Sequence, residues 1–330
     1  MRGALLVAVV LLALTLADQW NKVSDSLHEL TVLGMVLSGV MTVLAVGTTV
    51  LAWRTLLLGL GAHLPLRAAV RVFFVGQIGK YIPGSVWPVV AQMELSRDYG
   101  VGRAESASAS LVVLALAVPS GGVIATATLP FVSASALRHY WWALLAIPVF
   151  LVLLHPKVLS RLLALAARLL KRPALTQPLA MRHVLTAAGW LMLGFLCYGI
   201  AAWLVGRDLR PTGGDGRLVL LSIGAYALAW TAGFLIIVLP AGAGVREAVL
   251  VLALSPALPK GPAILVAVVA RLFATIADLV WAGIGFSLRP RTPADPDGVT
   301  DGSPPAGNGR GGGPHGAPDT PEAAGATARG

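Results

Sequence analysis

Charged residues are scarce in this sequence, and their scarcity defines the class of the protein. Only 12% of the 330 residues are charged, whereas 56% are hydrophobic and the mean hydropathy is +0.79. Soluble domains carry about 25% charged residues. The composition therefore excludes an ordinary soluble protein and indicates an integral membrane protein.

Cysteine is almost absent, and so are the motifs of several enzyme classes. The single Cys197 excludes a disulfide framework within the chain and a cysteine metal site. No two of the six histidines are four residues apart, so no metal site is expected. The sequence also lacks a glycine-rich phosphate loop and a recognisable nucleophile elbow, and no cofactor is expected.

The net charge of +10 does not indicate nucleic-acid binding. Beside the hydrophobic runs no folded soluble module remains that would present a basic face. The basic residues are interpreted as determinants of topology and of attraction to the lipid surface, so no nucleic-acid partner is expected.

Long hydrophobic runs dominate, and they predict helices. The alternation of apolar and polar residues that marks a membrane β-barrel is missing, and a helical span needs roughly 20 apolar residues. The predicted fold is all-α, a polytopic integral membrane protein with about eight transmembrane helices. The predicted ranges are 4–17, 30–52, 106–130, 140–155, 184–206, 218–239, 244–256 and 261–288.

The sequence predicts a transmembrane domain at residues 1–289 and a disordered cytoplasmic tail at 290–330, which is rich in Gly, Pro, Ala and Asp. The loop at 156–183 has six Lys and Arg residues and no acidic residue, so it is predicted to be cytoplasmic. Both termini are then cytoplasmic in a multi-pass protein of the cell membrane. Residues 4–17 also resemble a signal peptide, but we interpret them as an uncleaved span.

Two Pro/Gly breaks interrupt the hydrophobic sequence. The first lies in GQIGKYIPGSVWPVV, and the second lies in FLIIVLPAGAGVREAVLVLALSP. Proline removes a backbone donor and glycine loosens a helix, so each break frees backbone groups that need protein or trapped water as partners. We interpret both as interrupted or re-entrant segments, a pointer to a transporter's binding site, with two unrelated loops as the alternative. The residues of the breaks are Pro83, Gly84, Pro240, Gly242 and Gly244.

Charged residues near the second break are candidates for substrate binding. Arg246 follows the break directly and is the natural contact for a phosphate, because cations lower the cost of an anion inside the membrane. Glu247 points about 100° away from Arg246 on a helix and is expected to pair with Arg271. Asp278 is expected to extend the same polar face. A structural ion pair that locks helices together is the alternative.

The region of the first break, residues 61–105, is too polar for a lipid-exposed crossing and is interpreted as membrane-associated. Lys80 and Tyr81 are candidates for head-group contact, although interfacial snorkelling of Lys80 beside Tyr81 is the favoured interpretation. Glu94 and Arg97 are further candidates, and a surface pair on an amphipathic helix is the favoured interpretation for them.

The segments GKYIPGSVWPVVAQMELSRDYGV and LPAGAGVREAVL, followed by Arg271, resemble the lysylphosphatidylglycerol synthase transmembrane region family of flippase-like proteins. The resemblance covers about residues 1–290. In the first segment Trp87 and Pro88 interrupt the family pattern, and the acid appears only at Glu94. The residues that match the second motif in place are Pro240, Gly242, Gly244, Arg246 and Glu247.

Family members fused to a soluble aminoacyl-transferring domain make aminoacylated phosphatidylglycerol, and no such domain is recognised in this sequence. The resemblance therefore implies the transmembrane half alone, thought to move a lipid or a lipid-linked head group between leaflets. The preferred function is a flippase of an anionic phospholipid or a polyprenyl-phosphate substrate, and the expected partner is a membrane lipid or lipid-linked glycan. Two alternatives remain: a membrane partner of a separate glycosyltransferase or synthase, and a membrane-embedded transferase acting on a lipid carrier.

Overall fold

The computed structural model describes residues 29–81, 87–132, 138, 145–153, 155, 157–158, 161, 179–210, 216–235 and 244–288. The elements of these ranges are helices, with no strand among them, so the predicted all-α class is confirmed. In chain order they are α3 (Val32–Gly59), α4 (Leu66–Gln77), η1 (Ile78–Tyr81), α5 (Trp87–Arg97), α6 (Arg103–Thr128), η2 (Leu129–Val132), α8 (Ala146–Leu153), α10 (Met181–Asp208), α11 (Gly216–Leu235), α12 (Val245–Leu254) and α13 (Lys260–Ser287).

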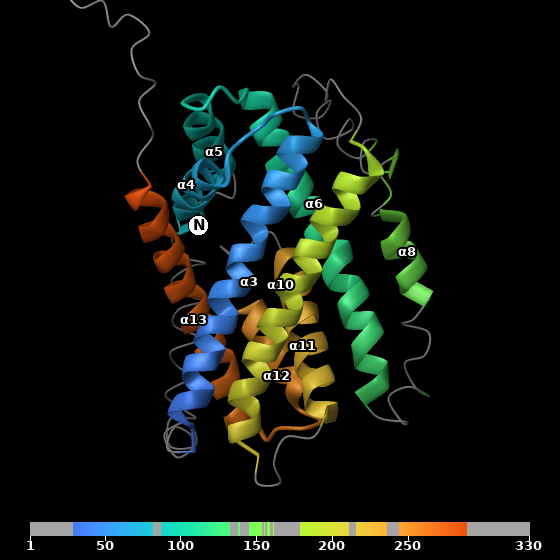
Figure 1. Cartoon of the computed structure of the whole chain (residues 1–330). Helices are drawn as coiled ribbons and strands as arrows, with labels where there is room; N and C mark the ends of the chain where they lie inside the picture. Colours follow the sequence, from blue (N-terminus) through green and yellow to red (C-terminus); the bar gives the residue numbers. More distant parts are fainter. Residues whose placement is uncertain are drawn as a thin grey trace, which may run out of the picture. The chain divides into compact units, whose positions relative to one another are not determined.

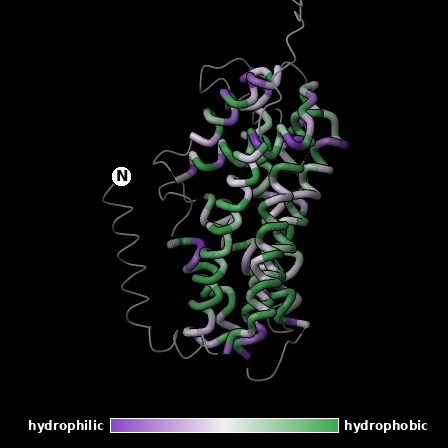
Figure 2. Tube along the Cα trace, turned by 60° about the vertical axis from the view of Figure 1, so that its left-hand side comes forward, coloured by the Kyte–Doolittle hydropathy of each residue, from purple (hydrophilic) through white to green (hydrophobic). Residues whose placement is uncertain are grey.

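Five of these helices, α3, α6, α10, α11 and α13, are long and apolar enough to cross a membrane. Each coincides with a predicted span, and Figure 2 shows hydrophobic residues along the helices with hydrophilic ones mostly near their ends. The predicted span at 244–256 forms only the ten residues of α12, about half the length that a crossing needs. The span at 4–17 lies outside the described residues, as does the tail, and 140–155 is described only in part, around α8.

The long helices run between two ends, which we call end A and end B. At end A the start of α3 meets the end of α10, because Thr31 donates from its backbone nitrogen and its hydroxyl to Oδ2 of Asp208, at 3.0 and 2.6 Å. At end B, Gly59 of α3 packs so closely on His183 of α10 that a β-carbon would not fit. The two helices are therefore antiparallel neighbours.

Helix α13 runs from end A to end B. It starts just after Leu258, which lies beside Gly206 near the end of α10. At its other end, the Leu288 carbonyl accepts a hydrogen bond at 3.1 Å from Nη1 of Arg71 on α4. Phe74 of α4 stacks on Trp281 of α13, with ring centroids 4.8 Å apart. Helix α4 is thus held against the second half of α13.

Two helix pairs approach the middle of the bundle from opposite ends (Figure 1). Helices α4 and α5 pack against each other and are joined by short loops to α3 and α6 at end B. Helices α11 and α12 also pack against each other, and they are attached to α10 and α13 at end A. In each pair the described residues on either side of the break are at the helix ends away from this attachment.

Most residues of the breaks, Pro83, Gly84, Pro240 and Gly242, lie outside the described residues. Gly244 is described and precedes α12 with a φ of +87°. This left-handed conformation is accessible to glycine without a steric cost, and it lets the chain turn into the first residue of α12.

A buried hydrogen-bond chain holds the α4–α5 pair against α3 and α6. Nε1 of Trp53 donates to Oγ of Ser110 at 3.0 Å, and this hydroxyl lies 2.5 Å from Oε1 of Gln92 on α5. One turn later, Oγ of Ser96 lies 2.9 Å from Oγ of Ser106. Buried polar networks that are satisfied in this way rigidify a structure. The pair is therefore a fixed element at end B.

Candidate functional site

Helix α13 carries two charged residues near its middle. Arg271 and Asp278 are its twelfth and nineteenth of 28 residues. Seven residues are close to two helical turns, so the side chains share a face and lie about 10 Å apart along the axis. A charge at this depth is expensive in a membrane unless it is partnered or functional.

Asp278 is paired with the first helix pair. Its Oδ2 lies 2.5 Å from Nζ of Lys80 in η1, and the two side chains are 16% and 31% exposed. Lys80 stands directly before the first break. The interpretation favoured from the sequence, interfacial snorkelling of Lys80, did not include this pair with a carboxylate of α13. The side chain of Tyr81 is outside the described part of the structure.

Arg271 is paired with the second helix pair. Its Nε lies 3.8 Å from Oε1 of Glu247, so the ion pair expected from the sequence is present. The other carboxylate oxygen of Glu247 accepts a hydrogen bond from the backbone nitrogen of Gly244 at 2.7 Å. Glu247 therefore caps α12 and neutralises part of Arg271 at the same time, in keeping with the preference of helix N-termini for carboxylates.

Arg246 turns away from Glu247 and contacts two tyrosines that the sequence analysis did not single out. Its guanidinium donates a hydrogen bond to Oη of Tyr226, and its Cζ lies 4.6 Å from the centroid of that ring. Tyr198 of α10 stacks on Tyr226 of α11 at 4.6 Å, with Cζ of Arg246 at 5.9 Å from the Tyr198 ring. Such cation–π contacts hold a guanidinium in place and leave other N–H donors available.

These charged groups form one assembly, which we call the central cluster: Lys80, Arg246, Glu247, Arg271 and Asp278. Arg246 is close enough to Arg271, Glu247 and Asp278 for their charges to act on it. Within the cluster three cations face two carboxylates. An excess of one positive charge in the middle of a bundle favours an anionic ligand.

Glu94 and Arg97 do not belong to the central cluster. Both lie on α5 with half-exposed side chains and form the expected surface pair, at 3.4 Å. Glu94 also accepts two hydrogen bonds from Arg103, each 2.9 Å long. The Arg103 hydrogen bonds, with Arg97 in addition, hold the pKa of the Glu94 carboxyl below its usual value. This group is a surface network at end B.

Among the described residues there is no group of three His, Cys, Asp or Glu side chains that would hold a metal ion. The central cluster offers the chemistry of its own charges. It can bind an anion through guanidinium and ammonium groups, and it can exchange an internal ion pair for a pair with a ligand.

Comparisons with known proteins bear on this arrangement. A search of curated proteins found no match. The family model described as the lysylphosphatidylglycerol synthase TM region matches residues 2–282. This range contains both breaks, all five residues of the central cluster and both tyrosines. The chain therefore belongs to the lysylphosphatidylglycerol synthase transmembrane region family.

Proposed function

We propose that this protein moves an anionic lipid head group, that of a phospholipid or of a polyprenyl phosphate, from one leaflet of the membrane to the other. The observation that carries the proposal is the central cluster. The cluster has one more cation than carboxylates. It lies near the middle of α13, where the α4–α5 pair from end B and the α11–α12 pair from end A both contact this helix.

A phosphate head group is costly to move through hydrocarbon because its charge loses its hydration. Cations placed halfway along the path lower this cost. Arg246 and Arg271 are the groups best suited to bind it, because guanidinium groups form bidentate hydrogen bonds with phosphate. The contact of Arg271 with Glu247 is long, at 3.8 Å, so a phosphate oxygen at hydrogen-bond distance would compete well with it.

The internal carboxylates have a role in this proposal. When no lipid is bound, Glu247 and Asp278 partner Arg271 and Lys80, which avoids unpaired cations inside the bundle. When a phosphate arrives, it replaces a carboxylate. Binding is then an exchange of partners, which keeps the affinity moderate and allows release on the other side.

Leaflet-to-leaflet movement in liposomes tests the proposal. The purified protein is reconstituted, fluorescent phosphatidylglycerol and polyprenyl-phosphate analogues are added, and the fluorescence protected from external dithionite is followed. We expect faster movement of at least one analogue than in protein-free liposomes. Arg246→Ala and Glu247→Gln should slow it by at least about tenfold, equivalent to about 1.4 kcal/mol.

Arg97→Ala is the matched control, because Arg97 is a half-exposed cation outside the central cluster. It should leave the rate unchanged. A wild-type rate equal to that of protein-free liposomes for both analogues would overturn the proposal and favour a partner or transferase role. Unchanged rates in folded Arg246→Ala and Glu247→Gln proteins would remove the central cluster from the path.

A further inference from the structure

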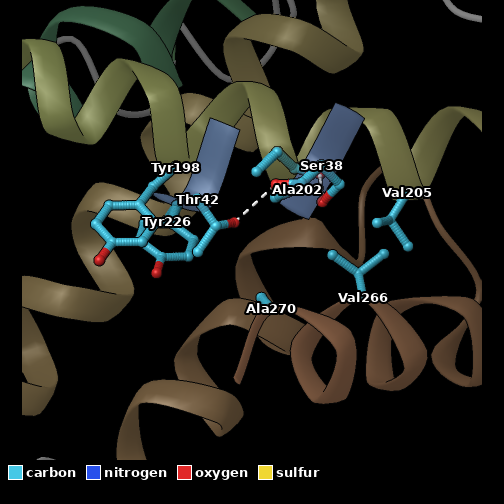
Figure 3. Close-up of a pocket in the computed structure, with 9 residues that line it drawn as sticks. Ser38, Thr42, Tyr198, Ala202, Val205, Tyr226, Val266 and Ala270 are labelled. Atoms are coloured by element: carbon cyan, nitrogen blue, oxygen red, sulfur yellow. Dashed lines mark hydrogen bonds between the residues drawn. The ribbon is translucent and has the colours of Figure 1, made fainter. Parts of the chain in front are cut away.

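A narrow crevice adjoins the two tyrosines of the candidate site (Figure 3). It has no room for a water molecule. Its walls come from α3, α10, α11 and α13, and the residues that line it are Ser38, Thr42, Tyr198, Ala201, Ala202, Val205, Tyr226, Val266 and Ala270.

The crevice leads from the central cluster toward end A. Tyr198 lies ten residues before the end of α10 and Val205 only three, a difference of about 10 Å along the helix. Ser38 lies within two turns of the start of α3, also at end A. On α13, Ala270 directly precedes Arg271. One end of the crevice is therefore beside the cluster, and the other is within about two turns of end A.

The walls of the crevice carry the hydroxyls of Ser38 and Thr42 and three alanines, together with two valines and the two tyrosines. Oγ of Ser38 donates to the Ala201 carbonyl at 2.9 Å, and Oγ1 of Thr42 donates to the Ser38 carbonyl at 2.9 Å. To bind an anionic head group, each hydroxyl would turn its single proton from the backbone carbonyl to a phosphate oxygen. The alanines add little bulk, so a small separation of the helices would widen the crevice.

The tyrosine pair closes the end beside the cluster. Tyr226 is fully buried, is stacked on Tyr198 and accepts a hydrogen bond from Arg246. A phosphate accepts a stronger hydrogen bond from a guanidinium than a neutral phenol does. A head group bound to Arg246 would thus take the donor that fixes the Tyr226 hydroxyl.

We infer that the crevice is the closed form of the head-group passage between the central cluster and end A, and that Arg246 holds Tyr226 as its gate until an anionic head group binds. The inference rests on the proposed function and extends it to one half of the path. Ser38 and Thr42 then supply hydrogen bonds to the head group beyond Arg246. Tyr226 acts as a positioning residue.

Thiol labelling tests the inference without measuring transport. Ala202→Cys is made in a Cys197→Ala background, and its reaction with a membrane-impermeant methanethiosulfonate is timed in phosphatidylcholine vesicles with and without phosphatidylglycerol. We expect phosphatidylglycerol to raise the labelling rate by about tenfold, the factor that corresponds to 1.4 kcal/mol. Adding Tyr226→Phe, which keeps the ring and removes the hydroxyl, should raise labelling in phosphatidylcholine alone.

Ala188→Cys is the control, because Ala188 is equally buried on α10 but does not line the crevice. It should stay unlabelled in both kinds of vesicle. Labelling of Ala202→Cys that changes neither with phosphatidylglycerol nor with Tyr226→Phe would overturn the inference, even if transport is observed. If transport fails while phosphatidylglycerol still raises the labelling of Ala202→Cys, the proposed function is overturned and the opening of the crevice by a head group stands, so the two failures are distinguishable.

A second variant tests whether the width of the crevice limits the movement of the lipid. Ala270→Leu adds bulk to a crevice that is already too narrow for water, and it changes no charged residue of the central cluster. We expect folded protein that binds phosphatidylglycerol as the wild type does and moves it about tenfold more slowly. An Ala270→Leu protein with the wild-type rate would contradict a passage along these walls.

Discussion

Lys80 and Asp278 form an ion pair of 2.5 Å between η1, which ends at the first break, and the middle of α13. Arg271, two turns earlier on the same face of α13, holds Glu247 at the start of α12. A single helix face thus binds two helix pairs that reach it from opposite ends of the bundle. Predictions for each pair follow from this arrangement.

The Lys80–Asp278 pair should contribute to stability. Asp278→Asn leaves the Lys80 ammonium without its carboxylate in a half-buried position, so we expect a loss of about 1–3 kcal/mol, between the values for exposed and buried pairs. Thermal unfolding in detergent measures it. The exchanged variant, Lys80→Asp with Asp278→Lys, should recover part of the loss. A double variant less stable than both single variants would argue against the pairing.

Glu247 should show two separable roles. Glu247→Gln keeps an oxygen that accepts from Gly244 and loses the charge that faces Arg271, whereas Glu247→Ala loses both. We expect Glu247→Ala to be less stable than Glu247→Gln by about 1 kcal/mol, the usual value of a helix cap. The thermal midpoints of the two variants give the comparison. Equal midpoints would mean that the cap contributes nothing.

Gly199 should be intolerant of any side chain. A β-carbon there would overlap the backbone of Ile223 on α11, so Gly199→Ala must push α10 and α11 apart. Overpacking of this kind costs about 1–3 kcal/mol. Gly189→Ala on the same helix is the control, since no atom lies within 4 Å of its added carbon. It should be neutral or stabilising, and similar destabilisation of both variants would show that the effect is not packing.

The surface network of Glu94 should depend on pH. Its folded-state pKa is lowered by Arg103, so the network stabilises the protein above the unfolded pKa, about 4.3, and loses this effect as the pH falls through the folded value. Glu94→Gln should therefore differ from the wild type at neutral pH and converge with it in acid. Thermal midpoints measured between about pH 3 and about pH 7, a range that brackets the pKa of a carboxyl group, test this. A difference that grows in acid would contradict it.

Much of the helical architecture was predictable from the sequence, because long apolar runs in a membrane leave few alternatives to helices. The Glu247–Arg271 pair was also predictable, since a cation in the middle of a span requires a partner. The short span predicted at 244–256 corresponds to α12, which is not among the helices long enough to cross a membrane, because hydrophobicity alone does not distinguish a short helix from a crossing. Helix α12 ends at Leu254, directly before the turn at Ser255, and so has only ten residues.

The tyrosine pair was not predicted because it depends on how α10 packs on α11. Neither Tyr198 nor Tyr226 has a neighbour in sequence that indicates the contact. Their position offered one signal, since both fall inside predicted spans, whereas tyrosine usually concentrates at the membrane interface. The partner of Lys80 was missed for the same reason. Its pairing depends on the register of α4 against α13, which is determined by contacts such as Phe74 with Trp281.

The spacing of Arg271 and Asp278 on α13 has a mechanical consequence. If α13 turned about its own axis, both ion pairs would lengthen together and the two helix pairs would be released at once. If it tilted about its middle, one pair would lengthen while the other kept its contact. Tilting would therefore keep one helix pair bound to α13 while the other pair separates from it.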